Sequence, residues 1–184
     1  ICGPGNIYVT EAKRQVQGTI RIDSLAGPSE VLVIADKEAR ADFIAADLLA
    51  QLEHDEHAAA MLVTPEKEII ESVQKEMASQ VDRLRRKKII EASLEHNCYL
   101  VLTRDLDEAL GLANQVAPEH LELCVRDPER MSHQVRHAGA IFLGDYTPEA
   151  IGDYIAGPNH VLPTGRTARF SSGLSVDDFI KKSS

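Results

Sequence analysis

Short apolar runs alternate with amphipathic helical patterns along most of this chain, and this alternation limits the possible folds more than any other feature. The run Val31–Ala35 is apolar at every position, which is typical of a strand buried on both faces. Further strands are expected at 59–64, 99–102, 121–125 and 140–143. Helices are expected between them at 37–54, from 65 to about 96 with a break near 83–88, at 105–116 and at 128–137.

Strands that alternate with helices in this way favour right-handed crossovers and parallel pairing. The sequence therefore predicts an α/β fold, an open and mostly parallel Rossmann-like sheet with helices on both faces. In such sheets ligands bind beyond the carboxyl ends of the strands, so we expect the functional residues at that edge. A short helix is also predicted near Asn6, after Gly3-Pro4-Gly5, and this glycine-rich entry suits either an anion or a simple turn.

Composition and charge exclude several classes of function. The formal net charge of −9 argues against a nucleic-acid partner, and the basic run 83–88 is typical of a solvated helix face. No apolar run is long enough to span a bilayer, so no membrane partner is expected. Cys2, Cys98 and Cys124 form no CxxC pattern, which favours a reducing cytoplasm. Because the chain begins at Ile1 without a methionine, we expect a fragment of a longer protein.

Gln51 and His54 are the first candidates for a functional site. They are three apart near the end of a predicted helix, so their side chains leave one face at a spacing that suits metal ligands. Solvated polar residues, with the histidine favoured by the negative end of the helix dipole, are the ordinary alternative. Asp153, in a glycine-rich segment after the last strand, is a further candidate ligand because its carboxylate also suits zinc.

Glu119 and His120 are adjacent titratable residues where a helix gives way to a strand. Such a pair can divide two proton transfers between a base that acts on a substrate and a base that activates water. Each candidate also has a structural explanation: Glu119 as a helix-end partner, His120 as a core histidine, and Asp153 and Ser29 as turn formers. Spacing in the sequence leaves these alternatives open.

A series of motifs, in the same order and from the first residue almost to the last, resembles histidinol dehydrogenase. The resemblance implies a zinc-dependent enzyme of histidine biosynthesis, an NAD-dependent four-electron alcohol dehydrogenase that converts L-histidinol to L-histidine with two NAD through a bound aldehyde. The segments that carry the resemblance are Gly3-Pro4-Gly5-Asn6, Ala26-Gly27-Pro28-Ser29-Glu30, residues 47–55 around Gln51-Leu52-Glu53-His54, residues 114–121 around Pro118-Glu119-His120, Gly152-Asp153-Tyr154, residues 157–164 around Pro158-Asn159-His160, and residues 170–176.

Carried over residue by residue, the resemblance implies a zinc site and a substrate pocket built from the same side chains. Gln51, His54 and Asp153 correspond to zinc ligands that also contact the substrate, and Ser29 and His120 correspond to further substrate contacts. The zinc is expected to hold the substrate in place rather than to generate a hydroxide.

The resemblance also assigns the chemistry. Glu119 and His120 correspond to the two general bases, with His120 taking the alcohol proton and Glu119 activating the water that hydrates the aldehyde. Asn6 corresponds to a residue that contacts NAD, and His160 to a histidine of the pocket rim.

The family pattern extends beyond this chain on both sides. Residues 1–25 are expected to end the NAD-binding domain, 26–165 to form the Rossmann-like zinc and substrate domain, and 166–184 to begin a C-terminal linker or tail. The fourth zinc ligand is expected from the tail of the partner in a homodimer, so the 184 residues alone are expected to be inactive. Three alternatives remain: a paralogue that oxidises another small alcohol, a zinc and ligand-binding module without turnover, and a cysteine nucleophile at Cys2 or Cys124.

Overall fold

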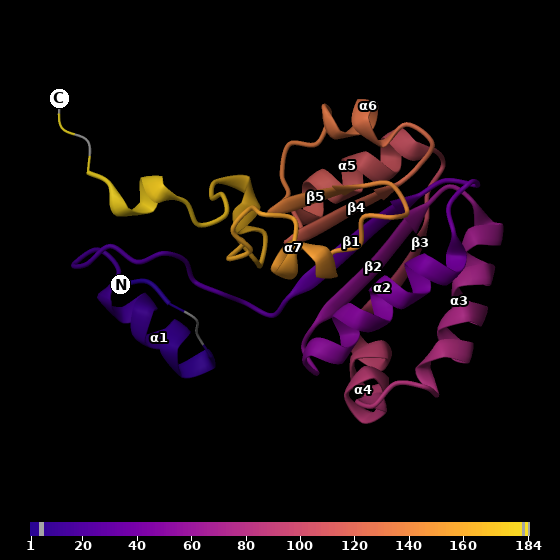
Figure 1. The fold of residues 1–184 in the computed structure, drawn as a ribbon, viewed down its shortest axis with the longest axis horizontal. Coiled ribbons are helices and arrows are strands. Elements are labelled where there is room, and N and C mark those ends of the chain that lie inside the picture. The colour runs from indigo at the N-terminus through magenta and orange to yellow at the C-terminus, as the bar shows by residue number, and fades with distance from the viewer. Residues whose placement is uncertain (4–5, 182, 184) are drawn as a thin grey trace.

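A five-stranded parallel sheet lies at the centre of the computed structural model, which describes residues 1–3, 6–181 and 183 (Figure 1). Every pairing in the sheet is parallel, and the strand order is β3-β2-β1-β4-β5. The predicted open α/β sheet is therefore confirmed. The strands are β1 (Glu30–Ala35), β2 (Ala59–Thr64), β3 (Cys98–Leu102), β4 (His120–Cys124) and β5 (Ala140–Leu143).

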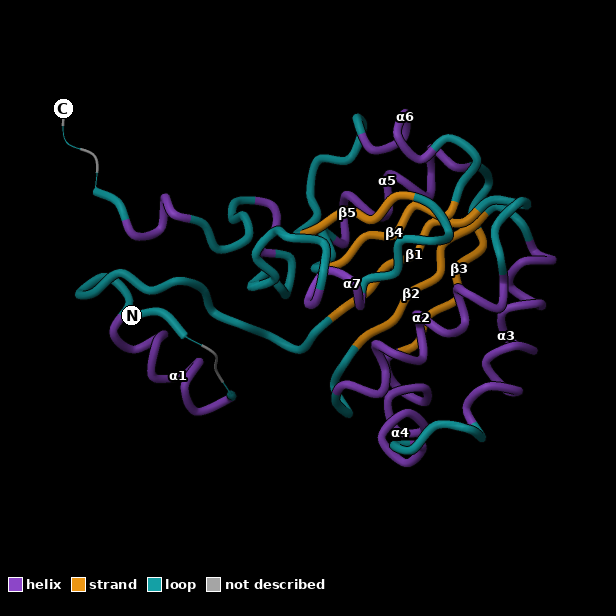
Figure 2. The backbone as a smooth tube through the Cα atoms, viewed as in Figure 1, coloured by secondary structure: helices purple, strands orange, loops and turns teal. Residues whose placement is uncertain are grey.

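Helices cover both faces of the sheet, as the alternation predicts. Helices α2, α3 and α4 pack together on one face, while α5 and α6 lie over the other (Figures 1 and 2). The helical elements are α1 (Ile7–Val16), α2 (Ala41–His54), α3 (Lys67–Val81), α4 (Lys87–Asn97), α5 (Leu106–Val116), α6 (Pro128–Ser132), α7 (Ala150–Tyr154) and the 3-10 turns Thr167–Arg169 and Val176–Phe179.

Two helices are shorter than predicted. Helix α2 begins at Ala41 rather than near residue 37, because the Asp36 carboxylate accepts the Glu38 N–H and holds the preceding residues in a turn. Helix α6 ends at Ser132 rather than at residue 137. The chain after it is held in a loop by the Asn114 amide oxygen, which accepts the backbone N–H of Arg136 at 2.7 Å. The break between α3 and α4 falls where it was predicted.

The core consists of two layers separated by the sheet. Val31 and Val33 of β1 pack with α2, α3 and α4, whereas Leu32 and Ile34 pack with α5 on the other face. All four side chains are fully buried, and burial of one such side chain contributes about 1.5–3 kcal/mol. Packing on both faces therefore sets the register of the sheet.

Strand β4 carries a buried carboxyl group inside this apolar structure. Leu121 and Leu123 join the α5 layer, so the alternate residues, including Glu122, face the side covered by α2. The Glu122 side chain hydrogen-bonds to Asp47 of α2, and its Oε1 accepts the backbone N–H of Glu149 at 2.8 Å. Burial and the neighbouring carboxyl groups raise the pKa of Glu122 well above its ordinary value. The pair therefore joins α2, β4 and the chain that follows β5.

The chain after β5, residues 144–160, is called here the return segment. It leaves the carboxyl end of the sheet, where the Gly144 N–H donates to the Leu123 carbonyl at 3.0 Å. Tyr146 packs edge-on against Phe43 of α2, with ring centroids 5.6 Å apart. Since Glu149 contacts His120, the first residue of β4, the return segment crosses the α2 side of the sheet to its amino end.

The N-terminal segment lies apart from the sheet and beside the C-terminal residues (Figure 1). Asn6 caps α1 as predicted, since its Oδ1 accepts the N–H groups of Tyr8 and Val9. Arg21 bridges the two ends of the chain through a bond to the Ile180 carbonyl at 3.3 Å. The predicted glycine-rich anion site includes Pro4 and Gly5, which fall outside the described residues. None of the described helices is both long and apolar enough to cross a membrane.

The buried pair predicts a distinctive pH dependence of stability. Burial, and then the charge of Glu149, raise the pKa of Asp47 to about 7, against an ordinary value of 3.8. Because the folded-state pKa is raised, the stabilisation is fully present below pH 3.8 and is lost as pH rises through about 7. Asp47→Asn should remove this part of the slope, at most about 1.4 kcal/mol per pH unit in that window.

The measurement is the free energy of unfolding of both proteins from pH 4 to pH 8. Asp107→Asn is the matched control, because Asp107 is exposed on α5. The same pH dependence in the Asp47→Asn variant and the original protein would contradict the raised pKa of Asp47.

Candidate active site

The candidate residues gather at the amino end of the sheet. Ser29 precedes β1, Glu119 precedes β4, and His120 is the first residue of β4, in register with Val31. Helix α2 runs antiparallel to the strands, so Gln51 and His54 near its end approach the same edge. The expectation of a site beyond the carboxyl ends is wrong, because the helix ends and strand starts that carry these residues meet at the opposite edge.

A strained turn leads into the Glu119-His120 pair. Helix α5 ends at Val116, and the next residue, Ala117, has the left-handed backbone angles φ 54° and ψ 59° and is fully buried. Pro118 follows, and its carbonyl accepts the Gly139 N–H at 2.9 Å. The Glu119 carbonyl accepts the Ala140 N–H at the same distance, which joins the turn to the start of β5. Residue 139 must be small, because a Cβ there would lie 2.6 Å from the Glu119 carbonyl oxygen.

The Glu119 carboxylate is buried and held from the start of β1. Its Oε2 accepts the Glu30 N–H at 3.1 Å, and the Ser29 side chain hydrogen-bonds to it. Burial raises the pKa of Glu119 above its ordinary value, although the charge of His120 and these hydrogen bonds oppose the rise. A carboxylate with a raised pKa is a stronger base, so Glu119 suits proton abstraction.

His120 lies between three oxygen groups and a second histidine. Its Nδ1 is 3.0 Å from Glu149 Oε2, 3.1 Å from the Glu30 carbonyl oxygen and 3.7 Å from Glu119 Oε2. Burial disfavours the charged ring. The hydrogen bond and charge of Glu149, the charge of Glu119 and the hydrogen bond to the Glu30 backbone outweigh this effect and raise the pKa of His120. Its Nε2 is 2.9 Å from His160 Nε2, and the two rings stack with centroids 4.9 Å apart.

The return segment brings His160 and Asp153 to the same place. His160 Nε2 is 4.0 Å from Asp153 Oδ1, and burial, then the charge of His120, lower the pKa of His160. Gly152 lies under the His160 ring, and a Cβ at that position would collide with it. The structure therefore brings Asp153 near the base pair through His160, with its own side chain largely exposed.

Gln51 meets one requirement of a metal ligand. The residue is 2% exposed. Its Oε1 is the one buried side-chain nitrogen or oxygen atom among the described residues that lacks a hydrogen-bond partner. An unpaired buried oxygen costs about 1–3 kcal/mol, which an electrophile such as a metal ion would offset. The chemistry of an amide oxygen, an imidazole and a carboxylate also fits zinc.

The other two predicted zinc ligands, His54 and Asp153, have less support than Gln51. His54, one turn further along α2, is exposed, and its carbonyl accepts a bond from Arg86 at 3.3 Å. No three His, Cys, Asp or Glu side chains in the described part of the chain are grouped around a metal position. The predicted set contains only two residues of these types, His54 and Asp153, so their convergence with Gln51 stays a prediction.

Asn6 and the cysteines lie outside this group. The Asn6 amide oxygen is used to cap α1, so a contact with NAD would come from its nitrogen. Cys2 is exposed at the N-terminus, and Cys124 is buried at the carboxyl end of β4. Burial and nearby carboxyl groups raise the pKa of the Cys124 thiol, which disfavours the thiolate that a nucleophile requires.

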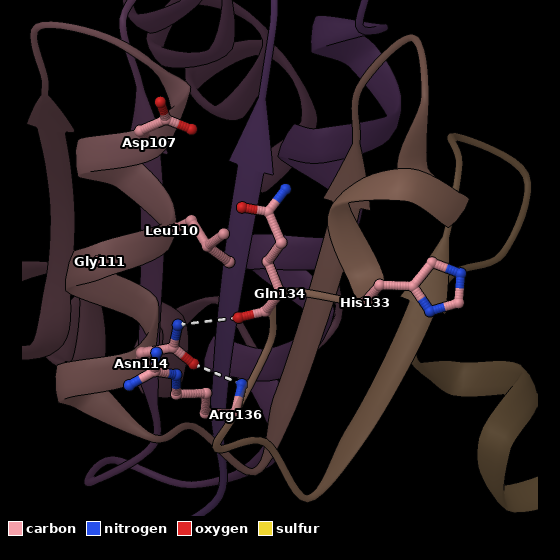
Figure 3. Close-up of a pocket in the computed structure, with 7 residues that line it drawn as sticks. All are labelled: Asp107, Leu110, Gly111, Asn114, His133, Gln134 and Arg136. Carbon is pink, nitrogen blue, oxygen red and sulfur yellow. Dashed lines mark hydrogen bonds between the residues drawn. The ribbon is translucent and has the colours of Figure 1, made fainter.

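The largest pocket described, of about 670 Å³, lies away from this site (Figure 3). It lies against α5, on the opposite face of the sheet from α2, and Asp107, Leu110, Gly111 and His133 are among the residues that line it. Asn114, which also lines the pocket, donates to the Gln134 carbonyl at 3.3 Å, so this residue of the sequence motif anchors a loop.

Sequence patterns did not identify Glu30, Glu149 and Gly152 as parts of the site. Glu30 supplies the N–H for Glu119 and the carbonyl for His120, and Gly152 makes room for His160. Glu149 contacts His120 from a loop 29 residues further along the chain, which no periodic pattern marks. Glu122 offered a signal, since a glutamate within the apolar run 121–125 requires a buried partner.

Comparison with known proteins points to a single family. The family model of histidinol dehydrogenase matches residues 1–184. Histidinol dehydrogenase of Cereibacter sphaeroides is 57% identical over 182 residues, which are 99% of this chain and 42% of the relative. That of Heliobacterium mobile is 56% identical over 184 residues, 100% of this chain and 43% of the relative. The chain therefore spans less than half the length of these relatives.

Comparison with solved structures points to the same family. A crystal structure of histidinol dehydrogenase from Elizabethkingia anophelis matches with a TM-score of 0.94 and 42% identity, over 98% of this chain and 42% of that one. Propionaldehyde dehydrogenase of Rhodopseudomonas palustris matches with a TM-score of 0.53 and 14% identity, over 86% of this chain and 49% of that one, which shows a shared fold alone. The resemblance inferred from the motifs is confirmed, and the chain belongs to the histidinol dehydrogenase family.

Proposed function

We propose that the complete protein containing this chain oxidises L-histidinol to L-histidine through bound histidinal, with two NAD as hydride acceptors. The observation that carries the proposal is the Glu119-His120 pair. Two buried bases are anchored side by side, Glu119 by the Glu30 N–H and His120 by Glu149, within a chain matched along its whole length by the family. Adjacent bases suit an oxidation that removes a proton from an alcohol and later a proton from water.

The first oxidation requires one base. His120 Nε2 accepts the proton of the substrate hydroxyl group while the carbinol carbon loses its hydride, and the C–O bond becomes the C=O bond of the aldehyde. Since Nδ1 lies against Glu149 and the Glu30 carbonyl, Nε2 is the nitrogen for this transfer, with the substrate hydroxyl group taking the place of His160 Nε2, which lies 2.9 Å away. The proton must leave His120 before the second hydride transfer, in which this residue accepts another proton.

The second oxidation requires water and the other base. Glu119 accepts a proton from a water molecule whose oxygen bonds to the aldehyde carbon, which gives the hydrate. Loss of a second hydride from that carbon, with a hydroxyl proton taken by His120, gives the carboxyl group of histidine. The raised pKa of Glu119 favours its part in this step.

Bound zinc would supply a fixed positive centre that orients the substrate. Gln51, His54 and Asp153 would hold it, with a fourth ligand from the partner of a homodimer. Gln51 supports this assignment through its unpaired buried oxygen. Asn6 would contact NAD. We further propose a cytoplasmic protein in which residues 1–25 end the NAD-binding domain, 26–165 form the zinc and substrate domain, and 166–184 begin the tail.

The two bases should be separable by mutation. His120→Asn keeps a donor near the position of Nδ1 but removes the base, so it should slow oxidation of both histidinol and histidinal. Glu119→Gln keeps an oxygen for the Glu30 N–H but cannot accept a proton, so it should chiefly slow the histidinal step. Each loss should be about a hundredfold to ten-thousandfold. The measurement is NADH formation with each substrate in the complete protein.

Melting curves of both variants serve as the control for folding. If either variant turned over both substrates at near-normal rates, or if the loss followed stability, the assignment of the bases would be wrong.

The metal role of Gln51 can be tested without turnover. Gln51→Leu removes an oxygen that has no partner, so the metal-free protein should be as stable as the original or more stable. Zinc affinity, measured by competition with a chelator, should fall at least about tenfold. Gln74→Leu, at an exposed position of α3, is the matched control. A destabilised metal-free variant with unchanged zinc affinity would show that Gln51 is a structural residue.

A further inference from the structure

The carboxylate of Glu149 forms a close contact with the catalytic histidine from a distant part of the chain. Its Oε2 is 3.0 Å from His120 Nδ1, and the two side chains are 16% and 4% exposed. The Glu30 carbonyl lies 3.1 Å from the same nitrogen. Because both neighbours can only accept, the hydrogen of a neutral ring lies on Nδ1, and the lone pair of Nε2 faces His160 Nε2, 2.9 Å away, where a substrate hydroxyl group would take its place.

Glu149 is itself held in place from the strand that carries His120. Its backbone N–H donates to Glu122 Oε1 at 2.8 Å, and the Glu122 side chain hydrogen-bonds to Asp47 of α2. The preceding residue is Pro148 and α7 begins at Ala150, which restricts the backbone on both sides. The backbone of Glu149 is therefore anchored to the strand that carries His120, and from there its carboxylate reaches the His120 ring.

We propose that Glu149 is the positioning residue of the base: it holds the His120 ring through Nδ1–H, directs Nε2 toward the substrate, and stabilises the imidazolium that forms on proton transfer. This rests on the proposed function. When the substrate O–H bond breaks, the proton goes to Nε2, and Glu149 stays ionised and gains a full ion pair. A carboxylate that orients a histidine base in this way is a general device of acyl-transfer triads.

The four charged or titratable groups around His120 come from three parts of the chain. Glu119 precedes β4, Glu30 begins β1, and Glu149 and His160 belong to the return segment. Glu119 is 3.7 Å from Nδ1 and is already engaged by the Glu30 N–H, so the shorter contact of Glu149 makes it the main partner. Removal of the charge of Glu149 alone should therefore lower the pKa of His120.

Glu149→Gln keeps the shape of the side chain and removes its charge. With histidinol, kcat should fall about tenfold to a thousandfold with little change in KM, since the contact is made to the base and not to the substrate. The acidic limb of the kcat profile should move to lower pH, because the imidazolium loses its partner. Glu129→Gln, at an exposed position of α6, is the matched control and should change neither quantity.

A second measurement is independent of turnover. NMR of protein with ¹⁵N-labelled histidine, with His120 assigned by its absence in His120→Asn, reports the protonated nitrogen and the pKa of the ring. The original protein should show hydrogen on Nδ1 and a raised pKa, and Glu149→Gln should lower that pKa. If the pKa falls as expected but histidinol is not oxidised by the original protein, the proposed function fails while the contact stands. If histidinol is oxidised and Glu149→Gln leaves the pH profile and ring pKa unchanged, the positioning role is overturned.

Discussion

Burial of the central strands on both faces is the constraint on which the rest of this structure depends. Val33 can pack toward α2 and Ile34 toward α5 only if helices lie on both sides, and parallel pairing then makes every helix run back along the sheet. The C-terminal end of α2 and the first residues of β1 and β4 consequently meet at one edge. The polar residues of the candidate site are attached to these ends, so the apolar layers determine which side chains become neighbours.

Much of the fold was predictable because it follows from periodicity. Strands β2 and β5 have the predicted bounds, and the break between α3 and α4 falls in the expected place. The edge that carries the site was not predictable from the general rule for open sheets, since that rule concerns loops after strands, whereas Glu119 and Ser29 lie in loops before them. The length of α6 also escaped prediction, because a side chain from α5 holds the chain beyond Ser132 in a loop.

The candidate site was predictable in part, and through resemblance rather than pattern. The motifs identify Glu119, His120 and Gln51, but not the groups that hold them. Glu30 acts through its backbone N–H and carbonyl groups, so the type of residue at this position does not reveal its role. Glu149 depends on the path of the return segment over the sheet, and that path is fixed in part by Glu122, a buried acid between two leucines of β4.

The anchoring of the return segment also limits how this family can vary in length. Gly144 is bonded to the Leu123 carbonyl and Glu149 to the Glu122 side chain, which are neighbouring residues of one strand. An inserted or deleted residue between these two anchors would shift Glu149 and everything after it away from β4. Changes in the length of this stretch should not be tolerated, so insertions and deletions among homologous chains should be absent here and confined to other surface loops.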